Sequence, residues 1–252
     1  MGLLFVFGLY AGLLAMLEIG RRLALHRRKG AGHTSESGTG AVNAAVFGLL
    51  GLLISFSFSG AQARFEWRRG LIVEEANDIG TAYLRLDLLP AAAQPALRDE
   101  FRRYLDARLA FYAATDTAAM RGDLVHLAAL QQRIWANAVA ASRDAGNSQA
   151  PMLLLPALNA MFDIATTRTA AVRTHTPMII FWLLAGLAMV AALLAGYDMA
   201  GNGARNWIHI VALATVLTVA VYVILDLEYP RMGLIDLRAY DRVLVDVRGS
   251  MQ

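Results

Sequence analysis

The sequence predicts an all-α membrane protein in which four transmembrane helices, arranged two plus two, flank an extramembrane helical bundle. Four long apolar runs, at residues 3–19, 41–58, 178–197 and 207–225, support this fold class, and a charged stretch separates the second run from the third. Each run is close to the roughly 20 residues that a helix needs to cross a hydrocarbon layer ~30 Å thick. Glu18 is the only formally charged residue within the runs, and no segment of any length shows the two-residue period of a strand.

Composition agrees with a membrane protein and excludes several functional classes. Hydrophobic residues make up 57% of the chain, whereas soluble domains are usually ~45–50% apolar. The mean hydropathy is +0.46. A net charge of only +3, without a basic helix that carries interleaved aromatic residues, argues against a nucleic-acid-binding protein. Because the chain has no cysteine, disulfides, thiolate metal sites and cysteine nucleophiles are excluded.

Residues 1–60 are predicted to hold the first two spans and a basic loop at 21–40. The first run lacks the basic start and the small-residue cleavage site of a secretory signal, so we expect it to be retained as a span. Gly8 and Gly12 have the spacing that lets a second helix approach closely, although glycine is also frequent in membrane helices generally.

The second span is predicted to continue beyond the membrane as the first bundle helix. No proline interrupts residues 41–89, apolar positions recur at helical spacing throughout, and Pro90 then ends the pattern. The interpretation is one helix, or two nearly collinear helices.

The rest of the extramembrane domain, 61–176, is predicted to hold three further helices at about 95–114, 122–143 and 152–174. Residues 177–225 then form a hairpin of the third and fourth spans, because the connection between them is too short to hold a domain. Residues 226–252 form a C-terminal tail, which packs against a neighbour or is loosely ordered.

The location is predicted to be the cell (inner) membrane, with several passes. The side on which the bundle lies stays open, because the two sides carry almost equal numbers of basic residues near the spans, seven against six. The density of basic residues in the 21–40 loop alone would place the bundle outside, in the periplasm of a bacterium.

An enzyme is not expected. The motifs of zinc peptidases, P-loop proteins, serine hydrolases and dinucleotide-binding domains are absent, and no two histidines have metal-ligand spacing on one helix. We therefore predict no catalytic residues, no metal and no cofactor.

One face of the second span is a candidate functional surface. Its residues are Asn43, Phe47, Leu50, Ile54 and Ser57, followed by Arg64 and Arg68. Such a stripe is typical of a pore-lining helix with a hydrophobic constriction and an anion-attracting mouth. It is equally typical of a buried packing face whose arginines extend to the membrane surface, and from the stripe alone the packing interpretation is favoured.

Three motifs then identify a resemblance. The run SFSFSGAQARFEWRRGLIVEEANDIGTAYLRLDLLP, the later LNAMFDIATTR, and DLEYPRMGLI after the last span resemble the bestrophin-like domain family, over about residues 18–235. The name of that family records a distant similarity to bestrophins, which are pentameric anion channels with four spans per subunit. The chain departs from bestrophins because it lacks an evident acidic calcium clasp and has a strongly basic first loop.

The resemblance implies roles for particular residues. Phe47, Leu50, Ile54 and also Phe58 would lie near a constriction, with a vestibule beyond it. The vestibule residues would be Glu74, Glu75 and Asn77, and a structural motif after the fourth span would contain Asp226, Glu228, Pro230 and Arg231.

Two functional hypotheses follow. The first is an oligomeric channel in the lipid bilayer, a pentamer by the resemblance, that passes inorganic anions. The alternative is a membrane-anchored sensor or scaffold whose helical domain binds a partner or a ligand.

Overall fold

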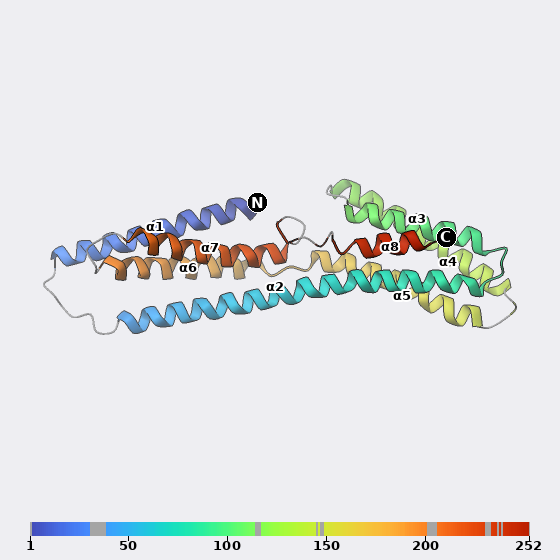
Figure 1. The fold of residues 1–252 in the computed structure, drawn as a ribbon, viewed down its shortest axis with the longest axis horizontal. Coiled ribbons are helices and arrows are strands. Elements are labelled where there is room, and N and C mark those ends of the chain that lie inside the picture. Colours follow the sequence, from blue (N-terminus) through green and yellow to red (C-terminus); the bar gives the residue numbers. More distant parts are fainter. Residues whose placement is uncertain are drawn as a thin grey trace. The chain divides into compact units, whose positions relative to one another are not determined.

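The computed structural model describes residues 2–30, 39–113, 117–144, 146, 149–200, 206–229, 233–235, 237 and 239–251, and within them every regular element is helical. Figure 1 shows the elements in order. They are α1 (Gly2–Gly30), α2 (Thr39–Leu84), the short 3₁₀ helix η1 (Arg85–Leu88), α3 (Gln94–Ala113), α4 (Thr117–Asp144), α5 (Gln149–Arg173), α6 (Met178–Met199), α7 (Trp207–Glu228) and α8 (Arg242–Ser250). The predicted all-helical fold is confirmed.

The chain forms two compact units. Unit 1 comprises Met1–Phe65 and His175–Asp236, and unit 2 comprises Glu66–Thr174 and Leu237–Gln252. The residues after 236 therefore pack with the bundle.

The second span and the first bundle helix are a single helix, as the sequence predicts. Helix α2 is 46 residues long and η1 follows it directly. Leu89, the residue before Pro90, has an extended backbone with φ −86° and ψ 159°, which is the conformation that a following proline favours.

Among the residues that the structure describes, five helices are long and apolar enough to cross a membrane. Four of them contain the four predicted runs, apart from Leu3 at the start of the first. They are Leu4–Arg27, Gly40–Leu88, Met178–Met199 and Trp207–Glu228. The fifth, Gln149–Val172 in α5, was not predicted to be a span, and its hydropathy of 1.2 is well below the 2.6 of α6 and the 2.5 of α7.

Within unit 1, α1 and α6 pack with their backbones in close approach. A Cβ atom on Gly20 would come within 3.0 Å of the Leu193 carbonyl oxygen, and one on Gly196 would do the same to the Leu17 carbonyl oxygen. Glycine is therefore required where the two helices cross. Of the glycines noted in the first span, Gly12 faces the Met189 side chain, whereas Gly8 has no neighbour within 4 Å.

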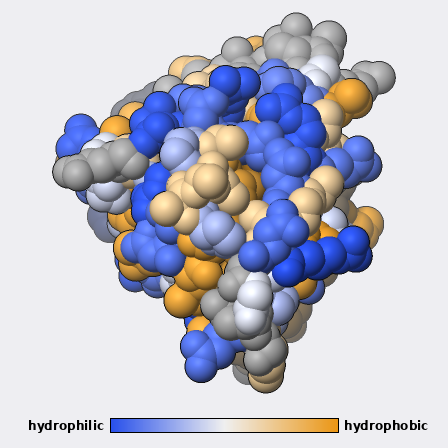
Figure 2. Space-filling view, turned by 90° about the vertical axis from the view of Figure 1, so that its right-hand side faces the viewer, coloured by the Kyte–Doolittle hydropathy of each residue, from blue (hydrophilic) through white to orange (hydrophobic). Residues whose placement is uncertain are grey.

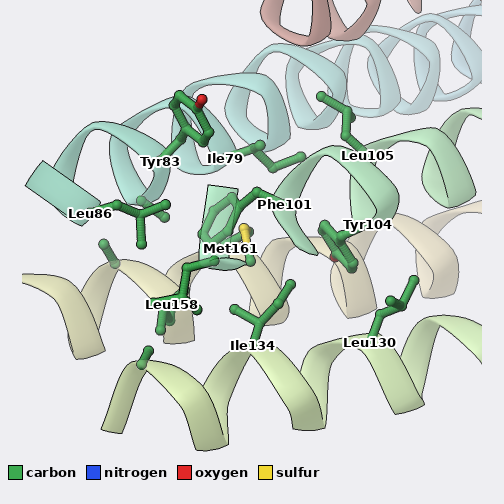
Figure 3. Packing of buried hydrophobic residues seen from close by; sticks show 14 of the residues in the cluster. Ile79, Tyr83, Leu86, Phe101, Tyr104, Leu105, Leu130, Ile134, Leu158 and Met161 are labelled. Atoms are coloured by element: carbon green, nitrogen blue, oxygen red, sulfur yellow. The ribbon is translucent and has the colours of Figure 1, made fainter. Parts of the chain in front are cut away.

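Unit 2 is a helical bundle around a large hydrophobic core, with a small second cluster formed by Leu71, Ile164 and Ala171. Side chains from α2, η1, α3, α4 and α5 point into a shared interior (Figure 3). The rings of Tyr83 and Phe101 meet edge to face with centroids 5.9 Å apart. Leu86, Phe101 and Leu158 have no exposed surface. Burial of this kind contributes roughly 1.5–3 kcal/mol for each large apolar side chain.

Helix α8 belongs to this bundle. Leu244 is fully buried in its core, Arg248 pairs with Asp106 of α3 at 2.7 Å, and Arg102 donates to the Met251 carbonyl oxygen at 3.3 Å. Of the two alternatives for the tail, packing against a neighbour is the one observed. The end of unit 2 shown in Figure 2 is mainly hydrophilic, with small hydrophobic areas between the polar groups.

Candidate functional site

The part of α2 in unit 1 has a buried side and an exposed side. Leu50 and Ala61 are 1% and 0% exposed. Asn43 is also buried, and its amide donates a hydrogen bond to Asp198 at the end of α6. On the exposed side, Leu52 and Phe56 are 50% and 66% exposed. The helix therefore presents an apolar surface that its own subunit does not cover.

Two of the six residues predicted to line a pore, Asn43 and Leu50, are buried within the subunit. A pore between copies of the chain is lined by side chains that one copy leaves accessible, and Asn43 and Leu50 do not meet this requirement. Phe47, Ile54 and Ser57 are half-buried. Phe58 is 43% exposed. For these four residues pore lining stays a prediction.

The exposed side of α2 carries more small residues than the exposed sides of α6 and α7. It carries Gly48, Gly51, Ser55 and Ser59 beside its large apolar residues. The Ser55 hydroxyl donates to the Gly51 carbonyl oxygen at 2.9 Å, so its lone pairs still face outward. The exposed residues of α6 and α7 are mainly large and apolar, as suits contact with lipid, and Gly186, Ala212 and Thr215 are the small ones among them. The large ones are Met178, Ile179, Trp182, Leu183, Val190, Trp207, Ile208, Val211, Val216 and Val219.

Small and hydroxyl-bearing residues on an exposed membrane helix favour contact with another helix or with a water-filled pathway. This surface was not among the residues predicted from the sequence, although its glycine and serine content was a signal that could have revealed it.

Arg64 is held within unit 1 by a buried carboxylate. Its Nε lies 2.9 Å from Oε2 of Glu228, which is fully buried at the end of α7, and its guanidinium also donates to the Thr176 hydroxyl. The Thr176 backbone N–H donates to Glu228 at 2.6 Å. Arg64, predicted to attract anions at a mouth, thus joins α2 to the start and the end of the α6–α7 hairpin.

Arg68 is buried in unit 2 with 5% exposure. Its Nε donates to the Ala171 carbonyl oxygen at 3.3 Å and its Nη2 to the Thr174 carbonyl oxygen at 2.5 Å. These carbonyls lie at the end of α5 and just after it, where a helix leaves acceptors unpaired. The side chain predicted to form a mouth with Arg64 therefore caps a helix inside the bundle.

The motif after the fourth span contains a turn closed by a carboxylate. Asp226 is 5% exposed and accepts hydrogen bonds from the backbone N–H groups of Leu234, at 3.1 Å, and Ile235, at 2.9 Å. A Cβ atom on Gly233 would collide with the Asp226 carboxylate, so a larger residue there would displace that carboxylate from its present position. Pro230 and Arg231 of the predicted motif lie outside the described residues.

Glu75 is the centre of a buried charge network in unit 2. Its oxygens accept from Arg108 Nε at 2.6 Å, Arg168 Nη1 at 2.6 Å and the Tyr112 hydroxyl at 2.9 Å. Arg168 also pairs with Asp241, and its guanidinium carbon lies 3.5 Å from the centroid of the Tyr112 ring. The network ties together α2, α3, α5 and the segment before α8.

The three residues predicted to face a vestibule therefore do not share one environment: one is buried and two are exposed. Glu75 has no exposed surface, whereas Glu74 and Asn77 are exposed on α2. Across the part of the chain that the structure describes, no group of three or more histidine or acidic side chains is arranged to hold a metal ion.

The fold is similar to that of bacterial bestrophin homologues. Two crystal structures of point variants of the homologue from Klebsiella pneumoniae match with TM-scores of 0.71 and 0.74, at 15% and 14% identity. The first match covers 98% of each chain, and the second covers 97% of this chain and 99% of the other. No curated protein matches the sequence.

A family model assigns the chain independently of these structures. The bestrophin-like domain model matches residues 7–238, which is nearly the whole chain. The resemblance drawn from the three sequence motifs is thereby confirmed, and the chain belongs to the bestrophin-like domain family.

Proposed function

We propose that copies of this chain form a closed ring in the cell membrane and that the exposed side of α2 in unit 1 lines an ion pathway along the ring axis. The observation that carries the proposal is the surface made by Gly48, Leu52, Ser55, Phe56 and Ser59. A face with small residues between large apolar ones is suited to close contact with another helix and to a hydrophobic constriction at an oligomer axis.

In this proposal the chain crosses the membrane four times, through α1, the first part of α2, α6 and α7. Helix α5 is assigned to the bundle, because Leu154, Leu158 and Met161 are fully buried in the core of unit 2. Its Arg168 is also buried and paired with Glu75. A helix whose apolar residues already fill a core has little apolar surface left for lipid.

Leu52 and Phe56 are the proposed constriction. They are one helical turn apart, both strongly exposed in the subunit, and rings of such side chains gate ion pathways by excluding water. This assignment replaces Leu50, which is buried.

Inorganic anions are the proposed permeant ions, on the strength of the family resemblance. Arg64 and Arg68 act in this proposal as structural cations, since one is paired with Glu228 and the other donates to backbone carbonyls. Charge selection would then arise from other groups along the pathway.

A sensor or scaffold is the second candidate. The observation that favours it is a cavity in unit 2, lined by residues of α3, α4 and α5. A ligand site in the bundle is compatible with either function.

The subunit count tests the ring. Native mass spectrometry of the full chain in a mild detergent should show a closed ring of four or more subunits, with a pentamer favoured by the resemblance. A stable monomer or dimer would provide no axis for the pathway and would favour the sensor.

A further inference from the structure

A cavity of about 450 Å³ lies within unit 2, between α4 and α5 and over one residue of α3. Its walls are mainly apolar or small, with Leu124, Leu127 and Ala128 on one side and Ala165 and Ala170 on the other. Volumes of roughly 300–1,000 Å³ are typical of small-molecule sites. The cavity therefore has room for a ligand of modest size.

Arg108 is the charged residue of the lining. It is 2% exposed, and its Nε donates to Glu75 while its Nη2 donates to the Tyr112 hydroxyl and to the Ala165 carbonyl oxygen. Within the described part of the chain, Nη1 has no hydrogen-bond partner. Two N–H groups of a buried guanidinium thus remain for an acceptor in the cavity.

The charged group that lines the cavity is positive, although the network behind it is balanced. Arg108 and Arg168 pair with Glu75 and Asp241, and neither carboxylate lines the cavity. Burial raises the pKa of the neighbouring Tyr104, so its hydroxyl stays protonated at neutral pH and adds no negative charge. An anionic group beside Arg108 would gain a charge-assisted hydrogen bond.

The polar rim of the cavity suits a ligand with one anionic end. The hydroxyls of Thr166 and Thr169 donate to the carbonyl oxygens of Phe162 and Ala165 and therefore have only lone pairs to offer. Gln131 donates its amide N–H to the Tyr104 hydroxyl. Arg108 Nη1 is therefore the donor that distinguishes an anionic ligand from a neutral one.

We propose that this cavity binds a small organic monocarboxylate, with the carboxylate on Arg108 Nη1 and an apolar body along Leu124, Leu127 and Ala165. The proposal concerns unit 2 alone and holds whether or not the chain forms a pore. It states which chemical class of ligand the bundle binds, namely a small organic monocarboxylate.

Benzoate is a suitable probe because it has one carboxylate on a compact apolar ring, and benzamide is its neutral counterpart. Ligand-observed NMR on the full chain in detergent, with empty micelles as the blank, should show saturable binding of benzoate. Benzamide should bind at least about tenfold more weakly, because it lacks the charge-assisted bond to Arg108.

Two neighbouring substitutions locate the binding. Ala128 lines the cavity and is exposed at its mouth, so Ala128→Trp should fill the entrance and weaken benzoate binding at least tenfold. Ala129 is exposed and does not line the cavity, so Ala129→Trp should bind as the parent does. Equal binding of benzoate and benzamide, no saturable binding of benzoate, or equal binding by the two variants would each overturn the proposal.

Discussion

Replacing Gly196 by valine is expected to prevent unit 1 from folding. The new Cβ atom would overlap the Leu17 carbonyl oxygen, which is backbone in a helix and has little freedom to move. Overpacking of a close interface typically costs about 1–3 kcal/mol and more when backbone must shift. We expect the variant to aggregate on size-exclusion chromatography in detergent, or to melt far below the parent.

Gly186→Val is the matched control, because Gly186 lies on the same helix and has no neighbour within 4 Å. This variant should elute and melt like the parent, since both substitutions change helix propensity equally. If the Gly196 and Gly186 variants behaved alike, the close crossing of α1 and α6 would be contradicted.

Neutralising Glu75 is expected to have the largest effect in unit 2. In Glu75→Gln, Arg108 and Arg168 would remain buried without the carboxylate that they share. Removing one member of a buried ion pair costs about 3–5 kcal/mol, because the partner charge stays desolvated. At roughly 2–4 °C per kcal/mol, the melting temperature should fall by about 10 °C.

Glu74→Gln is the control for this experiment. It changes the same residue type at the adjacent position, but Glu74 is exposed, and exposed substitutions usually alter stability by about 0.5 kcal/mol or less. Melting of the full-length proteins, followed by circular dichroism, gives the comparison. Equal melting temperatures for the two variants would show that the Glu75 network is not needed for folding.

Hydropathy and proline placement predicted most of the helices. Two parts were missed: residues 21–30, predicted as part of a basic loop, continue α1, and α8 lies in the segment predicted only as a tail. The long apolar runs gave α1, α6 and α7, and the absence of proline from 41 to 89 gave the continuous α2. These are local properties, because helix length and apolar content do not depend on distant parts of the chain.

The inward face of α2 could not be chosen from the pattern. Leu50 and Leu52 are identical in hydropathy, yet one is buried and the other half exposed. In a membrane helix both sides are apolar, so the usual contrast between a polar and an apolar face is missing.

The ion pairs of the charged sites could not be predicted from the sequence, because they join residues that are far apart along the chain. Arg64 pairs with Glu228, 164 positions away, and Glu75 meets Arg108 and Arg168, 33 and 93 positions away. Glu74 and Glu75 are neighbours of the same type, so the choice of the buried one depends on where α3 and α5 place their arginines. The three family motifs marked most of these residues without indicating that they pair.

The central claim is that the exposed side of α2 lines an ion pathway, and thiol modification of Phe56→Cys tests it most directly. The chain has no cysteine, so this variant carries a single thiol, and Leu50→Cys supplies a thiol on the buried side of the same helix. Ion flux would be measured in proteoliposomes before and after treatment with a bulky, charged methanethiosulfonate.

The account predicts that modification lowers the flux of Phe56→Cys at least about tenfold, because a bulky charged group would fill the proposed constriction. The parent and Leu50→Cys should be unaffected. Flux through Phe56→Cys that is insensitive to the reagent, or blocked only in Leu50→Cys, would contradict the assignment, and the absence of flux through the parent would contradict the pathway itself.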